Sequence, residues 1–290
     1  MRHLFSLSAG LLLLASPALA QGTSLADLQK AAASGDASAQ VELGSDYYAG
    51  KDVTQDYGQA LGWFQKAAAQ GDAEAEVAIG LMYSRGAGVP QDDAQALAWN
   101  RKAADQGNID AEYNMGVAYD NGRGVARDLA VAFSWYQKAA DQGLVDAQYS
   151  IGNMYETGEG VTQDYAQAMV WYQKAADQGY AAATYNLGIM YLNGEGVPAD
   201  NAQGLALIEK GARSGFAFAE GKMAAINYSG LAGQPVDKVK AYGWALLAAD
   251  GGDNDAGDLL DQMDAGHELS DDQLKQASDF ADSIASAFPS

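Results

Sequence analysis

Four tryptophans recur at a constant interval of 36 residues, and the sequence around them recurs with them. The last three open the nearly identical segments WNRKAADQG, WYQKAADQG and WYQKAADQG. A fixed period of roughly 20 to 50 residues is typical of a stacked array, in which no unit can bury its apolar face alone. The chain is therefore expected to fold as a series of similar units that stabilise one another. The four tryptophans are Trp63, Trp99, Trp135 and Trp171.

One unit, residues 110–143, contains the pattern of two helices. In its first part, small and apolar residues follow helical spacing up to Gly122, a residue that tolerates the positive φ of a helix C-terminus. A glycine-containing linker then leads to Asp128, which is placed to accept hydrogen bonds from the first N–H groups of a second helix. That second helix carries a broad apolar stripe around Trp135. We name the first helix of each unit helix A and the second helix B.

Residues in constant register predict how the helices pack. Each helix A carries an Ala, and most carry a Gly, that leave space for a bulky neighbour. We expect the tryptophans and a series of helix A tyrosines to fill this space, because alternating large and small side chains gives interior packing density. The small residues are Ala39, Ala75, Ala111, Ala147, Ala183, Ala219, Gly44, Gly80, Gly116, Gly152 and Gly188, and the tyrosines are Tyr47, Tyr83, Tyr119, Tyr155 and Tyr191.

The register predicts six helix pairs between two capping regions. A capping helix is expected in residues 21–35, and an acidic linker followed by a capping helix in residues 253–290. The last helix begins with the capping box of Ser270 and Gln273, and its apolar face should cover the sixth pair. The pairs are expected over residues 36–252, at 36–71, 72–107, 108–143, 144–179, 180–215 and 216–252, and the apolar face of the last helix comprises Leu274, Ala277, Ala281, Ile284 and Phe288.

The repeated unit resembles a known family. The pattern Ala-(x)3-Leu/Met-Gly-(x)2-Tyr, then Gly-x-Gly-Val-(x)2-Asp, then Ala-(x)2-Trp-(x)2-Lys-Ala-Ala, as in residues 147–176, is similar to the Sel1-like repeat, a relative of the tetratricopeptide repeat. The resemblance implies an all-α fold, an α/α right-handed superhelical solenoid of about six helix pairs with capping helices. It also implies a non-enzymatic adaptor for other proteins, in a family with exported bacterial members that tune envelope signalling or meet host proteins.

The first twenty residues are typical of a cleavable signal peptide. Arg2 and His3 precede an apolar run, and small residues end the segment at Ala20. The apolar run is shorter than the roughly 20 residues that a membrane-spanning helix needs. The sequence has no cysteine for lipid attachment or disulfides. We therefore expect cleavage after Ala20 and a periplasmic or secreted protein without membrane insertion.

The charge of the chain restricts its partners. It carries 17 basic and 38 acidic side chains, a formal charge of -21. Such a surface repels the phosphates of nucleic acids and anionic lipids. We expect no nucleic-acid partner, a preference for neutral or basic proteins or peptides, and a monomer.

Residue types for catalysis and metal binding are scarce. Beyond the first twenty residues the only histidine is His267, in the expected linker, so a Ser-His-Asp, Cys-His or zinc site lacks its usual members. Residues 253–258 are similar to the start of a calcium loop, but the Gly and the acidic ligands are out of place. Cysteine-rich relatives of the resembled family are linked to β-lactam binding, yet this chain lacks their cysteines, Ser-x-x-Lys and Lys-Thr-Gly. A β-lactamase-like hydrolase is the least favoured alternative, and no catalytic residue, cofactor or metal is predicted.

The resemblance places the candidate binding residues on helix A, which builds most of the concave face of tetratricopeptide-like superhelices. Tyrosines give large contact area at low entropy cost, and Asn amides pair with both N–H and C=O of an extended peptide. We expect binding of a protein or peptide there, acting by assembly or by occupancy. Two alternatives remain: the tyrosines pack between neighbouring A helices, or the surface binds peptide or glycan fragments of the cell wall. The candidates are Tyr113, Asn114, Asp120, Asn121, Tyr149, Ser150, Asn153, Glu156, Thr157, Tyr185, Asn186 and Asn193.

Overall fold

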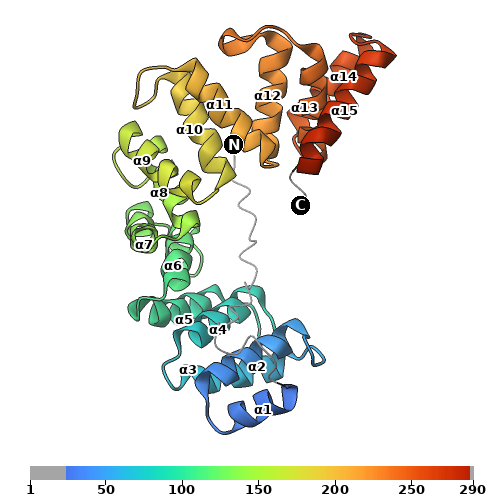
Figure 1. Cartoon of the computed structure of the whole chain (residues 1–290). Coiled ribbons are helices and arrows are strands. Elements are labelled where there is room, and N and C mark those ends of the chain that lie inside the picture. The colour runs from blue at the N-terminus through green and yellow to red at the C-terminus, as the bar shows by residue number, and fades with distance from the viewer. Residues whose placement is uncertain (1–23, 288–290) are drawn as a thin grey trace. The chain divides into compact units, whose positions relative to one another are not determined.

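The chain is all-helical throughout the range that the computed structural model describes, residues 24–287 (Figure 1). The all-α fold predicted from the repeats is therefore confirmed. The expected signal peptide lies outside the described residues. The chain divides into two compact units, unit 1 over residues 1–139 and unit 2 over residues 140–290.

The helices of unit 1 follow one another through short connections. They are α1 (Leu25–Ala33), α2 (Ala37–Ala49), α3 (Tyr57–Ala68), α4 (Ala73–Arg85), α5 (Asp93–Asp105), α6 (Ile109–Asn121) and α7 (Leu129–Asp141), whose last residues pass into unit 2. Of these, α2, α4 and α6 are A helices, and α3, α5 and α7 are B helices. The first helix, α1, packs Leu28 and Ala32 against Ala39 and Leu43 of α2.

Unit 2 repeats the same alternation and then adds two further helices. Its A helices are α8 (Val145–Thr157), α10 (Ala181–Asn193) and α12 (Ala217–Ser229), and its B helices are α9 (Tyr165–Asp177), α11 (Asn201–Arg213) and α13 (Lys238–Asp250). A short 3-10 helix, η1 (Leu231–Gly233), lies between α12 and α13, and α14 (Asn254–Ala265) and α15 (Asp271–Ala287) follow.

The connection between an A helix and its B helix is defined by one glycine and one aspartate. Gly122 ends α6 at φ 69°, a left-handed conformation that costs glycine little. Asp128 accepts a hydrogen bond from the N–H of Val131 at 3.0 Å and so caps α7. Both predictions are confirmed. The same two roles fall to Gly50, Gly86, Gly158, Gly194 and Gly230, and to Asp56, Asp92, Asp164, Asp200 and Asp237.

The side chains that fill the glycine positions differ from those predicted. A Cβ on Gly152 would lie 2.6 Å from the ring of Tyr172, the residue after Trp171. Gly44 receives Phe64 and Gly116 receives Tyr136 in the same way. The expectation that the tryptophans or the helix A tyrosines occupy these positions is wrong. Successive residues of a helix are rotated by about 100°, and this rotation brings the residue after the tryptophan onto the paired A helix.

Lysine side chains cover the indole rings of the repeat tryptophans. The ammonium of the lysine three residues later lies 3.4 Å to 3.8 Å from the ring centroid in four repeats, which is cation–π geometry. Trp135 and Trp171 are buried, each 6% exposed, whereas Trp63 and Trp99 are half-buried. The tryptophans thus contribute to the core most fully in the middle repeats.

The C-terminal region contains one more helix than predicted. Residues 254–265 form α14, so the expectation of a linker there is wrong. Asp253 caps this helix through the N–H of Ala256, and this places the segment similar to a calcium loop at a helix start. The reason is local: a capping aspartate followed by Leu259 and Met263 at helical spacing is sufficient for an amphipathic helix.

The last helix, α15, covers α13. It begins with the predicted capping box, in which the N–H of Ser270 donates to Gln273 Oε1 at 3.0 Å. Ala277, Ala281 and Ile284 are buried, and the ring of Phe280 meets Trp244 of α13 at 5.2 Å in an edge geometry. The apolar face therefore shields the sixth pair, except that Phe288 lies outside the described residues.

Candidate partner-binding surface

The candidate residues of unit 1 are engaged with their own unit. The Tyr113 ring lies 5.4 Å from that of Tyr136, and the Asn114 amide donates to Asn100 Oδ1 at 3.0 Å. Asp120 accepts from the Tyr136 hydroxyl at 3.4 Å and forms an ion pair with Arg127 at 3.7 Å. Asn121 is exposed and its amide donates to the carbonyl of Val117 at 2.9 Å. These side chains lie on one helix face, but most of their polar groups have partners within the unit.

The candidate residues at the C-terminal half of α8 and α10 form a polar surface in unit 2. Glu156 accepts a hydrogen bond of 2.5 Å from the hydroxyl of the buried Tyr172, and burial raises the pKa of Glu156 while that bond opposes the rise. Asn193 is exposed and donates to Glu195 at 3.3 Å, and the exposed Thr157 donates to the carbonyl of Asn153 at 2.9 Å. The exposed side chains here can exchange these local bonds for bonds to a partner.

Ser150 does not belong to that surface. Only 7% of the residue is exposed, and its hydroxyl donates to the carbonyl of Asp146 at 2.8 Å within the same helix. Asn186, which occupies the equivalent position in α10, is half-buried and its amide lies 3.5 Å from the Tyr149 hydroxyl. The expectation that Ser150 faces a partner therefore has no support in the structure, because a short side chain at this depth bonds to its own backbone.

Tyr149 lies between two other rings. Its centroid is 5.5 Å from that of Tyr172 in α9 and 5.0 Å from that of Tyr180, the residue that precedes α10. Burial raises the pKa of the Tyr149 hydroxyl, the charge of Glu156 adds to this rise, and the hydrogen bond from Asn186 opposes it. Tyr149 is thus partly a packing residue, which agrees in part with the alternative that the tyrosines pack between A helices.

The residues that precede the A helices were not singled out by sequence reasoning, and they differ between the units. In unit 1, Asp36, Asp72 and Asn108 each accept a hydrogen bond from a backbone N–H, at 2.8 Å to 2.9 Å. In unit 2 the equivalent residues are apolar or aromatic and make no side-chain cap bond: Leu144, Tyr180 and Phe216. The loss of such a cap costs about 1 kcal/mol. The signal was visible in the register, where a polar position becomes apolar after three repeats.

In unit 2 these residues join the tyrosines in a row of aromatic rings. Phe216 lies 5.6 Å from Tyr185 and 5.6 Å from Phe218, and Phe218 is 63% exposed. Aromatic pairs at these distances contribute about 0.5 to 1.5 kcal/mol, which offsets the missing caps in part. We name these five residues the aromatic row: Tyr149, Tyr180, Tyr185, Phe216 and Phe218.

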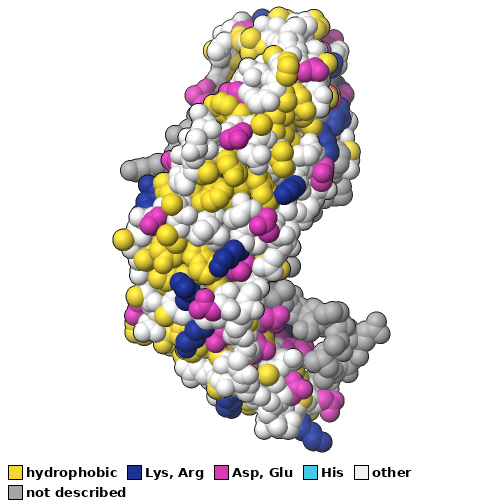
Figure 2. Space-filling view, turned by 90° about the vertical axis from the view of Figure 1, so that its left-hand side faces the viewer, with side chains coloured by type: hydrophobic (Ala, Val, Ile, Leu, Met, Phe, Trp, Pro, Cys, Tyr) yellow, Lys and Arg dark blue, Asp and Glu magenta, His cyan; other side chains and the backbone are white. Residues whose placement is uncertain are grey.

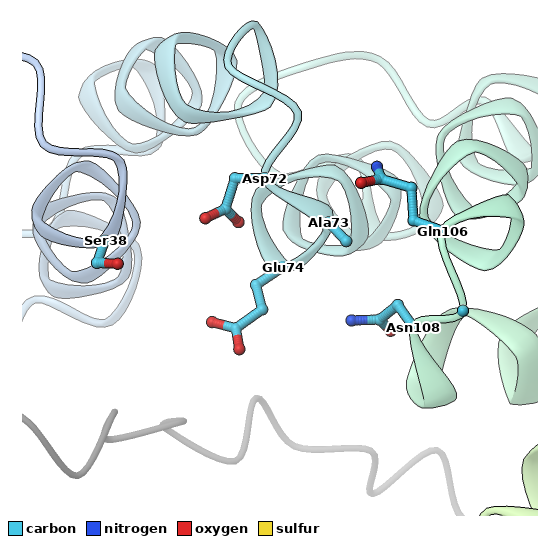
Figure 3. Close-up of a pocket in the computed structure, with 7 residues that line it drawn as sticks. Ser38, Asp72, Ala73, Glu74, Gln106 and Asn108 are labelled. Carbon is cyan, nitrogen blue, oxygen red and sulfur yellow. The ribbon is translucent and has the colours of Figure 1, made fainter.

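Unit 1 has a polar hollow at the equivalent positions. The hollow is open, has a volume of about 360 Å³ and is lined by Ser38, Asp72, Ala73, Glu74, Gln106, Gly107 and Asn108. The carboxylates of Asp72 and Glu74 are turned toward Ser38 (Figure 3). Burial raises the pKa of Glu74, and the charges of Asp72 and Asp110 add to that rise. The same edge of the repeat is therefore acidic and open in unit 1 but aromatic in unit 2.

A polar pair links the start of helix A to the end of helix B within a repeat. Gln178 donates to Gln148 at 2.9 Å in unit 2, and Gln106 donates to Glu76 at 2.8 Å in unit 1. In the sixth repeat Glu220 stands at the position of Gln148, but Gly251, seven residues after Trp244 as Gln178 is after Trp171, stands at the position of Gln178. Burial, and secondly the charge of Asp250, raise the pKa of Glu220 to about 7. The far end of the aromatic row is therefore bordered by carboxyl groups.

Groups for metal binding are not assembled in the part of the chain that is described. Among residues 24–287 no cluster of three His, Cys, Asp or Glu side chains is arranged to hold a metal ion. His267 is exposed in the connection between α14 and α15, with φ 47°. None of the described helices combines the length and the apolar character that crossing a membrane requires.

Paired A and B helices that recur along the chain define a class, the helical repeat proteins. Within that class, six consecutive segments match the Sel1 repeat: residues 37–72, 73–108, 109–144, 145–180, 181–216 and 217–253. The chain belongs to the Sel1 repeat family. Proteins of this family generally mediate protein–protein interaction, and their fold is a scaffold that is typically non-enzymatic.

Two solved structures agree with this assignment. The crystal structure of c5321, a protective antigen present in uropathogenic Escherichia coli strains, has a TM-score of 0.80 and 36% identity over 89% of this chain. The chain covers 56% of that protein, a little over half of its length. A Sel1 repeat protein from Oxalobacter formigenes has a TM-score of 0.69 and 34% identity, over 76% of this chain and 89% of the other. No curated protein matches the chain.

Proposed function

We propose that this protein is an exported adaptor that binds a protein or peptide segment through the A helices of unit 2. The observation that carries the proposal is the aromatic row at the start of the A helices of unit 2, whose helices α8 and α10 end in the exposed polar residues Thr157 and Asn193. Aromatic rings supply contact area at low entropy cost, and amide and hydroxyl groups can pair with the backbone of an extended segment. Binding of this kind acts by assembly, or by blocking another contact of the bound protein, and would suit the regulation of envelope signalling or assembly.

Export is supported by the first twenty residues. A basic start, an apolar run and small residues up to Ala20 are the features that a signal peptidase recognises. The proposed location is the periplasm or the outside of the cell. N-terminal sequencing of the protein from the periplasmic or culture fraction should begin at Gln21. Retention in the cytoplasm with Met1 in place would refute export.

The nature of the partner follows from charge. The formal charge of -21 disfavours nucleic acids and anionic membranes and favours neutral or basic proteins. Fragments of the cell wall, peptide or glycan, are the competing ligand class. Titration with purified peptidoglycan fragments separates the two, because an adaptor for proteins should show no saturable binding to them.

The direct test is site-specific photo-crosslinking in the cell. A benzophenone amino acid placed at the exposed Asn193 of α10 should trap a defined protein, which mass spectrometry identifies. Val170 of the B helix α9, 49% exposed, is the matched control position. The proposal fails if Val170 traps the same protein as efficiently as Asn193, or if the trapped protein does not bind the purified chain.

A further inference from the structure

The exposed end of the aromatic row combines an exposed aromatic side chain with acidic residues nearby. We propose that Phe216 and Phe218, which we name the aromatic edge, anchor a partner segment in which an apolar side chain is flanked by Lys or Arg. This inference rests on the proposed function and specifies the partner of that site. It assigns the anchoring role to the start of α12.

The apolar part of the proposal rests on Phe218. This residue is 63% exposed, and its ring lies 5.6 Å from that of Phe216. In four other repeats the same register position holds a polar residue, and in the fifth an alanine: Ser38, Glu74, Asp110, Asp146 and Ala182. A phenylalanine that is exposed where its equivalents are polar or small does not stabilise the fold by burial, whereas an apolar side chain of a partner would remove it from water.

The exposed apolar residues of the B helices differ from this cluster of rings. On the face drawn in Figure 2, hydrophobic side chains gather in separate patches with basic and acidic side chains between them. Val170 of α9 is 49% exposed, but it is a single aliphatic side chain and has no ring to form contacts of the kind that join Phe216 to Phe218 and Tyr185. Isolated exposed residues are normal on protein surfaces. A cluster of rings across two helices is the stronger indication of an anchor.

The charge around the aromatic edge specifies the flanking residues. Glu220 lies two residues after Phe218, and Asp250 is close enough to raise the pKa of Glu220. Asp253 lies against Gly221. Burial raises the pKa of Tyr185, and the charge of Asp253 adds to this rise. The bases within ten residues of Phe218 are Lys210, Arg213 and Lys222, and Arg213 forms an ion pair with Glu209 at 2.7 Å.

The excess of acid extends beyond the edge. Residues 140–290 carry 22 acidic and 7 basic side chains, against 16 and 10 in residues 1–139. Lys or Arg in a partner complements this field and accelerates association. A second copy of the chain would bring the same acidic groups together and is disfavoured, as is a phosphate-bearing surface.

The test uses a short fluorescein-labelled peptide in which Lys alternates with Leu, titrated against the purified protein by fluorescence anisotropy. Two matched peptides replace Lys by Glu, or Leu by Ser. The proposal expects saturable binding of the Lys/Leu peptide and at least tenfold weaker binding of the other two. Phe218→Ser should weaken binding of the Lys/Leu peptide about tenfold or more, whereas Val170→Ser should change it by less than about twofold. Because Phe218 is exposed, both variants should melt as the unmodified protein does.

Three results overturn the proposal. Equal binding of the Lys/Ser peptide would reveal attraction by charge alone. Unchanged affinity in Phe218→Ser would remove the anchor, and if Asn193→Ala then lowered affinity, the proposed function would stand while the aromatic edge failed. A concentration-dependent dimer in sedimentation velocity, lost in Phe218→Ser, would assign the edge to a second copy instead. Loss of the proposed function itself would be seen separately, as failure of crosslinking from Asn193.

Discussion

The two units are built from the same repeat, yet the residues that start their A helices follow different chemistry. In unit 1, Asp72 caps α4 with a hydrogen bond of 2.9 Å and borders an acidic hollow. In unit 2, Phe216 precedes α12 without a side-chain cap bond and packs against Tyr185 instead. A repeat can therefore keep its core and exchange a stabilising cap for surface that a partner can contact. The residues that differ between repeats are therefore a better guide to the proposed binding surface than the residues that the repeats share.

The largest expected effect tests whether the cores of the two units are equivalent. Trp135 of unit 1 and Trp171 of unit 2 are each 6% exposed, and each lies under a lysine. Trp135→Ala and Trp171→Ala should each lower the free energy of unfolding by about 3 to 5 kcal/mol. Urea denaturation followed by circular dichroism measures both. If the loss of unfolding free energy were much smaller in one unit than in the other, the cores of the two units would differ as well as their surfaces.

The largest pH-dependent effect among the carboxyl groups is expected at the sixth repeat. Burial and the Asp250 charge raise the pKa of Glu220 from an ordinary 4.5 to about 7. The folded protein then binds this proton more tightly than the unfolded chain, so Glu220 makes the free energy of unfolding fall as pH rises from 4.5 to about 7. Glu220→Gln should remove that part of the decline and stabilise the protein by about 1 kcal/mol at pH 8.

The control for this effect is Glu76 of unit 1, where Gln106 donates a hydrogen bond to the carboxylate and opposes the rise in pKa that burial causes. Glu76→Gln should therefore change the dependence of the melting temperature on pH much less than Glu220→Gln does. If the melting temperatures of the two variants depended on pH in the same way between pH 5 and pH 8, the assignment of the effect to Glu220 would be contradicted.

The starts of α4 and α12 should respond differently to substitution. Asp72→Ala removes a cap bond and should cost about 1 kcal/mol. Phe216→Asp supplies the missing cap but gives up the contacts with Tyr185 and Phe218, so its net effect on stability should be within about 1 kcal/mol of zero. Thermal melts of the two variants decide the point. A large loss of stability in Phe216→Asp would make Phe216 a core residue rather than part of a surface.

The smallest expected effect concerns the polar surface. Asn193 is exposed, so Asn193→Ala should change the free energy of unfolding by no more than about 0.5 kcal/mol. Its effect should be visible in affinity for the crosslinked partner. Tyr149→Ala is a less selective probe, because Tyr149 packs between two rings and its removal should also lower stability.

The sequence predicted the repeat because the repeat depends on local chemistry. The positive φ of Gly122 and the cap bond of Asp128 follow from residue types and short spacings, and both are confirmed. The partner of Gly152 was misidentified, since the rotation of Tyr172 onto helix A depends on how two helices face each other. The helix α14 was missed because its acidic composition resembled a linker.

The candidate surface was predicted only in part, for a related reason. Comparison of repeats by their shared residues led to Tyr149, Tyr185 and the amides but also to Ser150, which is buried. Phe216 and Phe218 stand where the repeats disagree, and only the structure shows that the ring of Phe216 meets those of Tyr185 and Phe218. Differences between repeats in one register are the signal that could have revealed them.

The central claim is that the start of the A helices serves stability in unit 1 and binding in unit 2. The most direct measurement is the affinity of Phe216→Asp and Asp72→Ala for the partner trapped from Asn193, determined by isothermal titration at one pH and ionic strength. We predict that Phe216→Asp loses at least about tenfold in affinity with its melting temperature nearly unchanged, and that Asp72→Ala melts lower but binds as the unmodified protein does. Full affinity in Phe216→Asp, or an equal loss of affinity in Asp72→Ala, would contradict the claim.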